Sequence, residues 1–117
     1  MLAAIARGAT WLLLLSYTVL LVWLQLRTPS GAPQPEGLDK LYHFLAYGGL
    51  MTLLVAAMGT QRMWRAFLMA SLFGFIMELA QATFSAAREP SFIDGLANMT
   101  GAGLAGLLII LVWRVFA

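Results

Sequence analysis

Apolar residues in this chain gather into four long runs, and polar residues fall mostly between the runs or near one end of them. The first run, Ala9 to Leu26, is continuous and is flanked by Arg7 and Arg27. About 20 consecutive apolar residues are enough to cross the hydrocarbon core of a bilayer as a helix. The pattern therefore predicts four membrane-spanning helices, near residues 9–26, 40–59, 65–84 and 92–113.

The connections between the runs contain residues that break or cap helices. Residues 28–37 hold three prolines and two glycines, which predicts an extended exposed loop. Asp39 follows at the start of the second helix, where a carboxylate interacts favourably with the helix dipole. Pro90 closes the connection to the fourth helix, and Asp94 is expected at or near the N-terminal cap of that helix.

A secretory signal peptide is the competing interpretation of the first run. Ser30-Gly31-Ala32 resembles a small-residue cleavage site. The apolar run is longer than a usual signal-peptide core, however, and Pro33 would follow the cut directly. These features favour a retained membrane span.

The composition supports a membrane protein with a single domain. Of the 117 residues, 62% are hydrophobic and 10% are charged, whereas soluble domains have roughly 45–50% apolar and about 25% charged residues. We expect an all-α fold in which residues 1–117 form one compact bundle of four transmembrane helices. No basic stripe indicates nucleic-acid binding, and the absence of cysteine excludes disulfides, thiolate metal sites and cysteine nucleophiles.

Orientation in the membrane depends on how lysine and arginine are divided between the two ends of the helices. One end has four basic residues and the other has three, which is a margin of one. The first set is Arg7, Arg62, Arg65 and Arg114, and the second set is Arg27, Lys40 and Arg88. The margin favours cytoplasmic N- and C-termini, which places the remaining polar residues on the outer side.

Three polar motifs interrupt the apolar pattern, each near the predicted outer end of a helix. The motifs are Asp39-Lys40-x-x-His43-x-x-x-Tyr47, Glu78-x-x-Gln81 continuing through Ser85 to Arg88, and Asp94-x-x-x-Asn98. Spacings of three and four place the members of each motif on one helix face. At about 1.5 Å per residue, His43, Glu78 and Asn98 lie roughly 4–10 Å below the helix ends. Because charges inside a membrane are costly, this shared depth predicts a polar cavity open to one side.

Each polar residue also has a structural interpretation. Asp39 can serve as a helix cap, and lone basic residues such as Lys40 often extend to the lipid headgroups. Asn98 and Gln81 can join helices by hydrogen bonds. Glu78 is the hardest to explain in this way, because a buried carboxylate without a partner is unfavourable in its charged form.

Small residues on the fourth and second helices predict that these helices pack closely against their neighbours. Ala97, Gly101 and Ala105 are spaced by four on the fourth helix, and Gly48-Gly49 narrows the second. Small residues at such spacings let membrane helices pack closely. Close packing would hold the polar side chains of neighbouring helices in register.

The three polar motifs, in this order and at these spacings, resemble the signature of the VanZ-like membrane proteins. The resemblance covers residues 39–106, and the first helix is similar only in character. It implies a four-helix, multi-pass protein of the bacterial cytoplasmic (inner) membrane. The founding member of that family is associated with reduced susceptibility to the glycopeptide teicoplanin. The family has no generally assigned biochemical activity, so the resemblance implies a fold and an envelope context without a reaction.

The leading functional hypothesis is an outer-side site that binds or modifies a cell-envelope component, either lipid-linked or related to peptidoglycan. Lys40 and Arg88 are candidate ligands for an anionic headgroup. His43 and Glu78 are a candidate acid–base pair, because imidazoles titrate near neutral pH and enzymes use such pairs for proton transfer. The candidate catalytic residues are His43, Glu78 and Asp94, and the candidate ligand-binding residues are Asp39, Lys40, Tyr47, Gln81, Arg88 and Asn98.

Other functions remain open at this stage. A hydrolase or transferase fits the residue types, but no nucleophile motif establishes an enzyme. A non-catalytic envelope assembly or binding factor would use the same residues, and a small proton-coupled carrier would need an oligomer to complete its pathway. One histidine without cysteine gives only a weak indication of a His–carboxylate metal site, so no metal and no cofactor are expected. The expected partners are membrane lipids and an anionic lipid-linked envelope precursor, and not nucleic acid.

Overall fold

The computed structural model describes residues 1–27, 35, 37–84 and 91–116. In these ranges all regular structure is helical. The elements are α1 (Leu2–Leu26), α2 (Leu38–Met58), the short 3-10 helix η1 (Thr60–Arg62), α3 (Met63–Phe84) and α4 (Phe92–Phe116). The described part of the chain thus has four helices long and apolar enough to cross a membrane. The prediction of an all-α, four-helix membrane bundle is confirmed.

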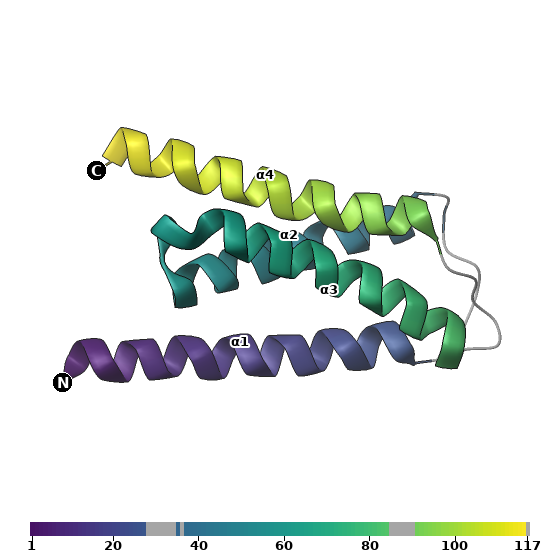
Figure 1. Cartoon of the computed structure of the whole chain (residues 1–117), viewed down its shortest axis with the longest axis horizontal. Coiled ribbons are helices and arrows are strands. Elements are labelled where there is room, and N and C mark those ends of the chain that lie inside the picture. The colour runs from purple at the N-terminus through teal and green to yellow at the C-terminus, as the bar shows by residue number, and fades with distance from the viewer. Residues whose placement is uncertain (28–34, 36, 85–90, 117) are drawn as a thin grey trace.

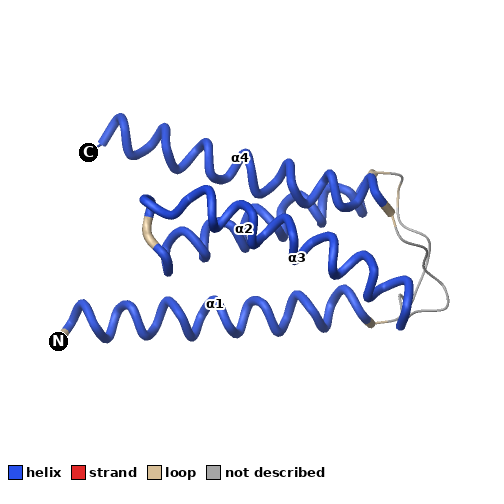
Figure 2. The backbone as a smooth tube through the Cα atoms, in the orientation of Figure 1, coloured by secondary structure: helices blue, strands red, loops and turns tan. Residues whose placement is uncertain are grey.

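The four α-helices run alternately in opposite directions, so the N- and C-termini lie at the same end of the bundle (Figure 1). At the opposite end of the bundle, α1 and α3 end and α2 and α4 begin. We call it the cluster end, because polar side chains cluster there. Helix α2 packs most extensively against α4, whereas α1 has the fewest contacts with the rest of the bundle (Figure 2). All three predicted polar motifs lie toward the cluster end.

The predicted helix boundaries are close to the observed ones except at the termini. Helix α1 begins at Leu2 instead of residue 9, and α4 continues to Phe116 instead of residue 113. The apolar run marks only the segment of a helix that lies in the hydrocarbon core of the membrane. Good helix formers such as alanine extend the helix beyond this segment. Helix α2 ends at Met58 because Gly59 has a φ of 97°, a conformation that glycine adopts readily.

Glycines bring α2 and α4 into direct backbone contact. A Cβ added at Gly101 would overlap the backbone carbonyl of Phe44, and one added at Gly48 would lie 3.4 Å from the carbonyl oxygen of Gly101. The small-residue ridge therefore acts as the sequence predicts. The surrounding core is apolar, and its buried members are Leu14, Leu21, Tyr47, Leu50, Met51, Leu54, Val55, Ala66, Ala70 and Ala102.

Candidate functional site

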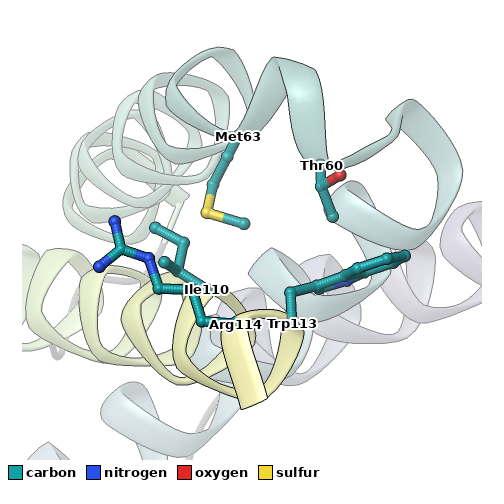
Figure 3. A pocket seen from close by; sticks show the side chains of 5 residues that line it. All are labelled: Thr60, Met63, Ile110, Trp113 and Arg114. Atoms are coloured by element: carbon teal, nitrogen blue, oxygen red, sulfur yellow. The ribbon is translucent and has the colours of Figure 1, made fainter. Parts of the chain in front are cut away.

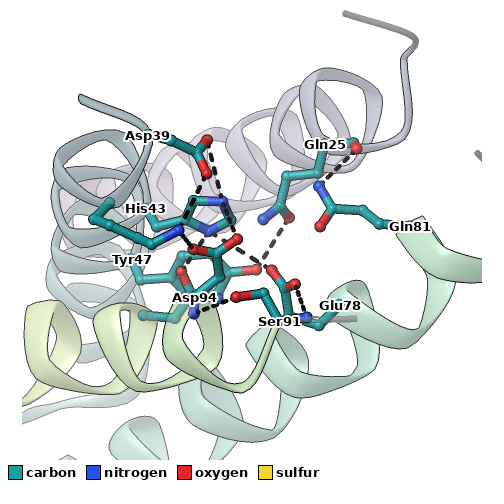
Figure 4. A network of polar contacts seen from close by, with 10 residues as sticks. Gln25, Asp39, His43, Tyr47, Glu78, Gln81, Ser91 and Asp94 are labelled. Carbon is teal, nitrogen blue, oxygen red and sulfur yellow. Dashed lines mark hydrogen bonds and ion pairs between the residues drawn. The ribbon is translucent and has the colours of Figure 1, made fainter. Parts of the chain in front are cut away.

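His43 lies at the centre of the polar residues at the cluster end (Figure 4). Its side chain is 6% exposed, and its Nδ1 lies 2.9 Å from Oδ1 of Asn98 on α4. An amide oxygen can only accept a hydrogen bond, so Nδ1 carries the proton of this bond. The other ring nitrogen, Nε2, faces two carboxylates, with Oδ1 of Asp39 and Oδ2 of Asp94 each 3.8 Å away.

Lys40 bridges the same two aspartates from their other oxygens. Its Nζ lies 2.5 Å from Oδ1 of Asp94 and 3.7 Å from Oδ2 of Asp39. The side chains of Lys40 and Asp39 are about half exposed, whereas that of Asp94 is 10% exposed. Lys40 and Asp39 therefore form the mouth of the site. The ammonium of Lys40, predicted to contact an anionic ligand, is already paired with carboxylates of the protein.

Glu78 of α3 lies on the Nδ1 side of the imidazole and is 4% exposed. Its Oε2 accepts a hydrogen bond from the backbone N–H of Ser91 over 3.3 Å. Its Oε1 has no hydrogen-bond partner among the described residues and lies 3.9 Å from Nδ1 of His43. The candidate acid–base pair is thus close in space, but the hydrogen bond of Nδ1 goes to Asn98. We call Asp39, Lys40, His43, Glu78 and Asp94 the ionic cluster.

The first turn of α4 aims Asp94 into the ionic cluster. Ser91 Oγ accepts a hydrogen bond from the backbone N–H of Asp94 over 3.1 Å, at the spacing typical of a capping residue and the third residue of a helix. The sequence places Asp94 at or near the cap, and Ser91 supplies the capping oxygen. Because Ser91 caps the helix, the carboxylate of Asp94 is left to pair with Lys40.

Tyr47 and Gln81 connect the site to α1 through Gln25, a residue that the sequence analysis missed. The hydroxyl of Tyr47 donates to Oε1 of Gln25 over 3.0 Å, and Nε2 of Gln81 donates to the backbone carbonyl of Gln25 over 2.8 Å. Gln25 is itself 8% exposed. The sequence did contain a signal for Gln25, because it is a polar residue at the end of an otherwise apolar run and lies at the same depth as the motifs.

Gly74 of α3 makes room for the innermost polar residue of the site. A Cβ at this position would lie 2.9 Å from Nδ2 of Asn98 and 3.1 Å from Cε1 of Tyr47. Asn98 is fully buried, and its Nδ2 has no hydrogen-bond partner in the described part of the chain. No pattern in the sequence singles out Gly74, because its role depends on contacts with two other helices.

The structure thus brings eight of the nine predicted site residues to one end of the bundle. Those in the ionic cluster or hydrogen-bonded around it are Asp39, Lys40, His43, Tyr47, Glu78, Gln81, Asp94 and Asn98. Arg88, the ninth, lies outside the described residues. Four helices contribute to this arrangement, since Gln25 adds α1 to the three helices that carry the motifs.

A concave region lies at the end of the bundle that holds the termini (Figure 3). Its lining comes from η1, the start of α3 and the last turns of α4, and consists of Thr60, Met63, Ile110, Trp113 and Arg114. None of these residues belongs to the predicted site. The chemistry-bearing side chains are therefore gathered at the cluster end.

The fold and the ionic cluster define a class of protein: a multi-pass membrane protein with a buried charged site at one end of a four-helix bundle. Comparisons with protein-family models, with curated proteins and with solved structures found no match to this chain.

Proposed function

We propose that this chain is a VanZ-like protein of the bacterial cytoplasmic (inner) membrane that binds or modifies a cell-envelope component. In this proposal both termini are cytoplasmic and the ionic cluster opens to the outer side. The supporting observation is the convergence of one imidazole, one ammonium and three carboxylates from three helices. Three of these five ionisable groups, His43, Glu78 and Asp94, are buried, which is costly in a membrane bundle and favours a functional role over a purely structural one.

The position of the mouth favours a ligand that is anchored in the membrane surface. Asp39 and Lys40 lie in the first turn of α2, so the entrance is at the depth of the lipid headgroups. The polar part of a lipid-linked precursor, or a peptidoglycan-related group, would reach the ionic cluster from there. The resemblance to the VanZ-like family adds a link to teicoplanin susceptibility.

The residues fall into two groups in this proposal. Turnover would depend on the imidazole of His43 and on Glu78 and Asp94, which lie beside its two ring nitrogens. Asn98 holds that imidazole, while Tyr47 and Gln81 hold the neighbouring helix α1 in place. A non-catalytic envelope assembly or binding factor would need the same arrangement, so the two alternatives are separated by comparing turnover with binding.

The test compares binding and turnover of a polyprenyl phosphate carrier by purified wild-type, His43→Gln and Glu78→Gln proteins in detergent. Loss of turnover with retained binding supports an enzyme, and parallel loss of binding supports a binding factor. Thr83→Val is the matched control, because Thr83 is exposed near the same end and bonds only the carbonyl of Leu79. If neither cluster variant changes binding, turnover or teicoplanin susceptibility of an expressing strain, the proposal is wrong.

A proton-coupled carrier has less support from the distribution of polar residues. Beyond Asn98, toward the end that holds the termini, the described core is apolar except for Ser71. A proton relay needs a chain of polar groups across the membrane, which a single copy of the described bundle does not supply. A site open to one side suits binding or modification better.

A further inference from the structure

Three side chains of the ionic cluster offer atoms that suit a metal ion. One nitrogen and two oxygens, from His43, Asp39 and Asp94, lie within 4.8 Å of one another. Nε2 of His43 is 3.8 Å from each carboxylate oxygen. Two ligands 3.8 Å apart at a tetrahedral angle would lie about 2.3 Å from a shared ion, compared with about 2.0–2.2 Å in zinc sites. Half-exposed Asp39 can supply the small inward movement.

The surroundings of the three ligands resemble the outer shell of a metal site. Metal-binding histidines almost always donate their second ring N–H to a carbonyl, a carboxylate or water, which fixes the ring. His43 does this through Nδ1 and Asn98. Lys40 holds Oδ1 of Asp94 and Oδ2 of Asp39, leaving the opposite oxygens turned toward Nε2. The ammonium therefore orients both carboxylates without using the candidate ligand atoms.

Glu78 provides an independent indication that a cation is needed. Its Oε1 is buried, points toward His43 over 3.9 Å and has no hydrogen-bond partner in the described ranges. Within these ranges three carboxylates lie around one ammonium, so the ionic cluster lacks two positive charges when all three carboxylates are ionised and the imidazole is neutral. Uncompensated charge is costly in a membrane interior. A divalent cation would supply the missing charge.

We propose that Asp39, His43 and Asp94 bind a divalent transition-metal ion of the Zn²⁺ class. An imidazole nitrogen favours such an ion over Mg²⁺ or Ca²⁺, which prefer sites made of oxygen ligands. Three protein ligands leave a coordination position for water or for a phosphate or carboxylate of an envelope ligand, on the side of the mouth. The metal site stands apart from the proposed envelope function, because metal binding is measurable without any envelope ligand.

The test measures binding of Zn²⁺ and Co²⁺ alone to tag-free, chelator-treated protein in detergent, by calorimetry and by the visible absorption of Co²⁺. We expect one ion per chain and an absorption spectrum of low-coordinate cobalt. Asp94→Asn and His43→Gln should each weaken Zn²⁺ binding by at least about 10–100-fold, the range seen even for outer-shell changes. Asp39→Asn should also weaken Zn²⁺ binding, and because Asp39 is about half exposed, this change should have little effect on folding.

Glu78→Gln is the matched control, because it removes one negative charge from the cluster without removing a proposed ligand. We expect it to weaken Zn²⁺ binding several-fold less than Asp94→Asn does. Equal losses in the two variants would mean that the cluster only attracts cations, and that result would overturn the site. So would the absence of one-to-one binding by the wild type up to millimolar Zn²⁺. Polyprenyl phosphate binding that persists without any metal binding would reject the metal site and retain the proposed function.

Discussion

Asn98 and Gly74 show how a single contact determines the geometry of the site. The oxygen of Asn98 holds the imidazole of His43, and its amide nitrogen lies against the Cα of Gly74. The space at Gly74 is therefore required for the orientation of the histidine, although glycine lowers the helix propensity of α3.

Gly74→Ala is expected to destabilise the protein. The added Cβ would lie 2.9 Å from Nδ2 of Asn98 and 3.1 Å from Cε1 of Tyr47, both in a buried region. Overpacking of this kind costs about 1–3 kcal/mol, which exceeds the gain of about 1 kcal/mol in helix propensity. Thermal unfolding in detergent measures the effect. Gly103→Ala is the control, because its nearest neighbour, Cε2 of Phe67, would be 3.5 Å away, and this variant should be as stable as the wild type or more stable.

Tyr47→Phe tests the link between the site and α1. The change leaves Oε1 of buried Gln25 without its donor, while the aromatic ring stays in place. Hydrogen bonds between membrane helices contribute about 0.6 kcal/mol on average and up to about 1.7 kcal/mol. We expect a loss of unfolding free energy in this range, measured in detergent. Tyr42→Phe, at a half-exposed position, should have no effect, and equal losses in both variants would contradict the link.

Residue spacing predicts which side chains meet, but not how they are paired. Helix periodicity alone places Asp39, His43 and Tyr47 on one face of their helix. Glu78 and Asn98 lie at a similar distance below the ends of their own helices, so the sequence also predicts that they meet this face. The individual bonds depend on rotamers and on helix separation, so the pairing of Lys40 with Asp94 could not be read from the sequence. Gln25 was missed because it is a single polar residue in an apolar run.

At the scale of elements, the close contact of α2 with α4 sets the separation of the polar motifs. Gly101 allows this contact because its Cα lies against the backbone of Phe44. The ridge of small residues predicted close packing on this face of α4, but it did not identify α2 as the partner helix. The ends of α1 and α4 were less predictable, because helices extend beyond the apolar run that marks the membrane.

Gly101→Ala is expected to be more damaging than Gly74→Ala. The obstacle is the backbone carbonyl of Phe44, which cannot turn aside as a side chain can, so the two helices must separate. We expect a loss of at least about 2 kcal/mol together with weaker contact between His43 and Asn98. Thermal unfolding and the yield of folded protein are the measurements. Gly8→Ala, with open space around the position, should be neutral or slightly stabilising, and a neutral Gly101→Ala would contradict the close packing.

At the scale of the whole molecule, the two ends of the bundle differ in charge. Every acidic residue of the sequence belongs to the cluster end or to its connections: Glu36, Asp39, Glu78, Glu89 and Asp94. The opposite end has arginines, including Arg62, Arg65 and Arg114. This arrangement agrees with cytoplasmic termini, although acidic residues have little weight in the rule for orientation.

Reporter fusions test the orientation directly. Fusions after Gln34 and after Glu89 should report an outer location, and a fusion after Arg62 should report a cytoplasmic one. The expectation follows from the distribution of arginine and lysine between the ends. A reversed pattern would place the ionic cluster on the cytoplasmic side and would exclude an outer envelope component as its ligand.

The ionic cluster reaches the surface of the described bundle through Asp39 and Lys40, whose side chains are about half exposed, and the core beyond Asn98 is apolar apart from Ser71. A molecule that binds at the ionic cluster would therefore enter and leave on the same side of the membrane. A charged reagent that cannot cross membranes should consequently reach Lys40 from one side of a sealed vesicle only. A bound ion or headgroup would protect Lys40 from that side, and intact cells would be sufficient to observe the protection.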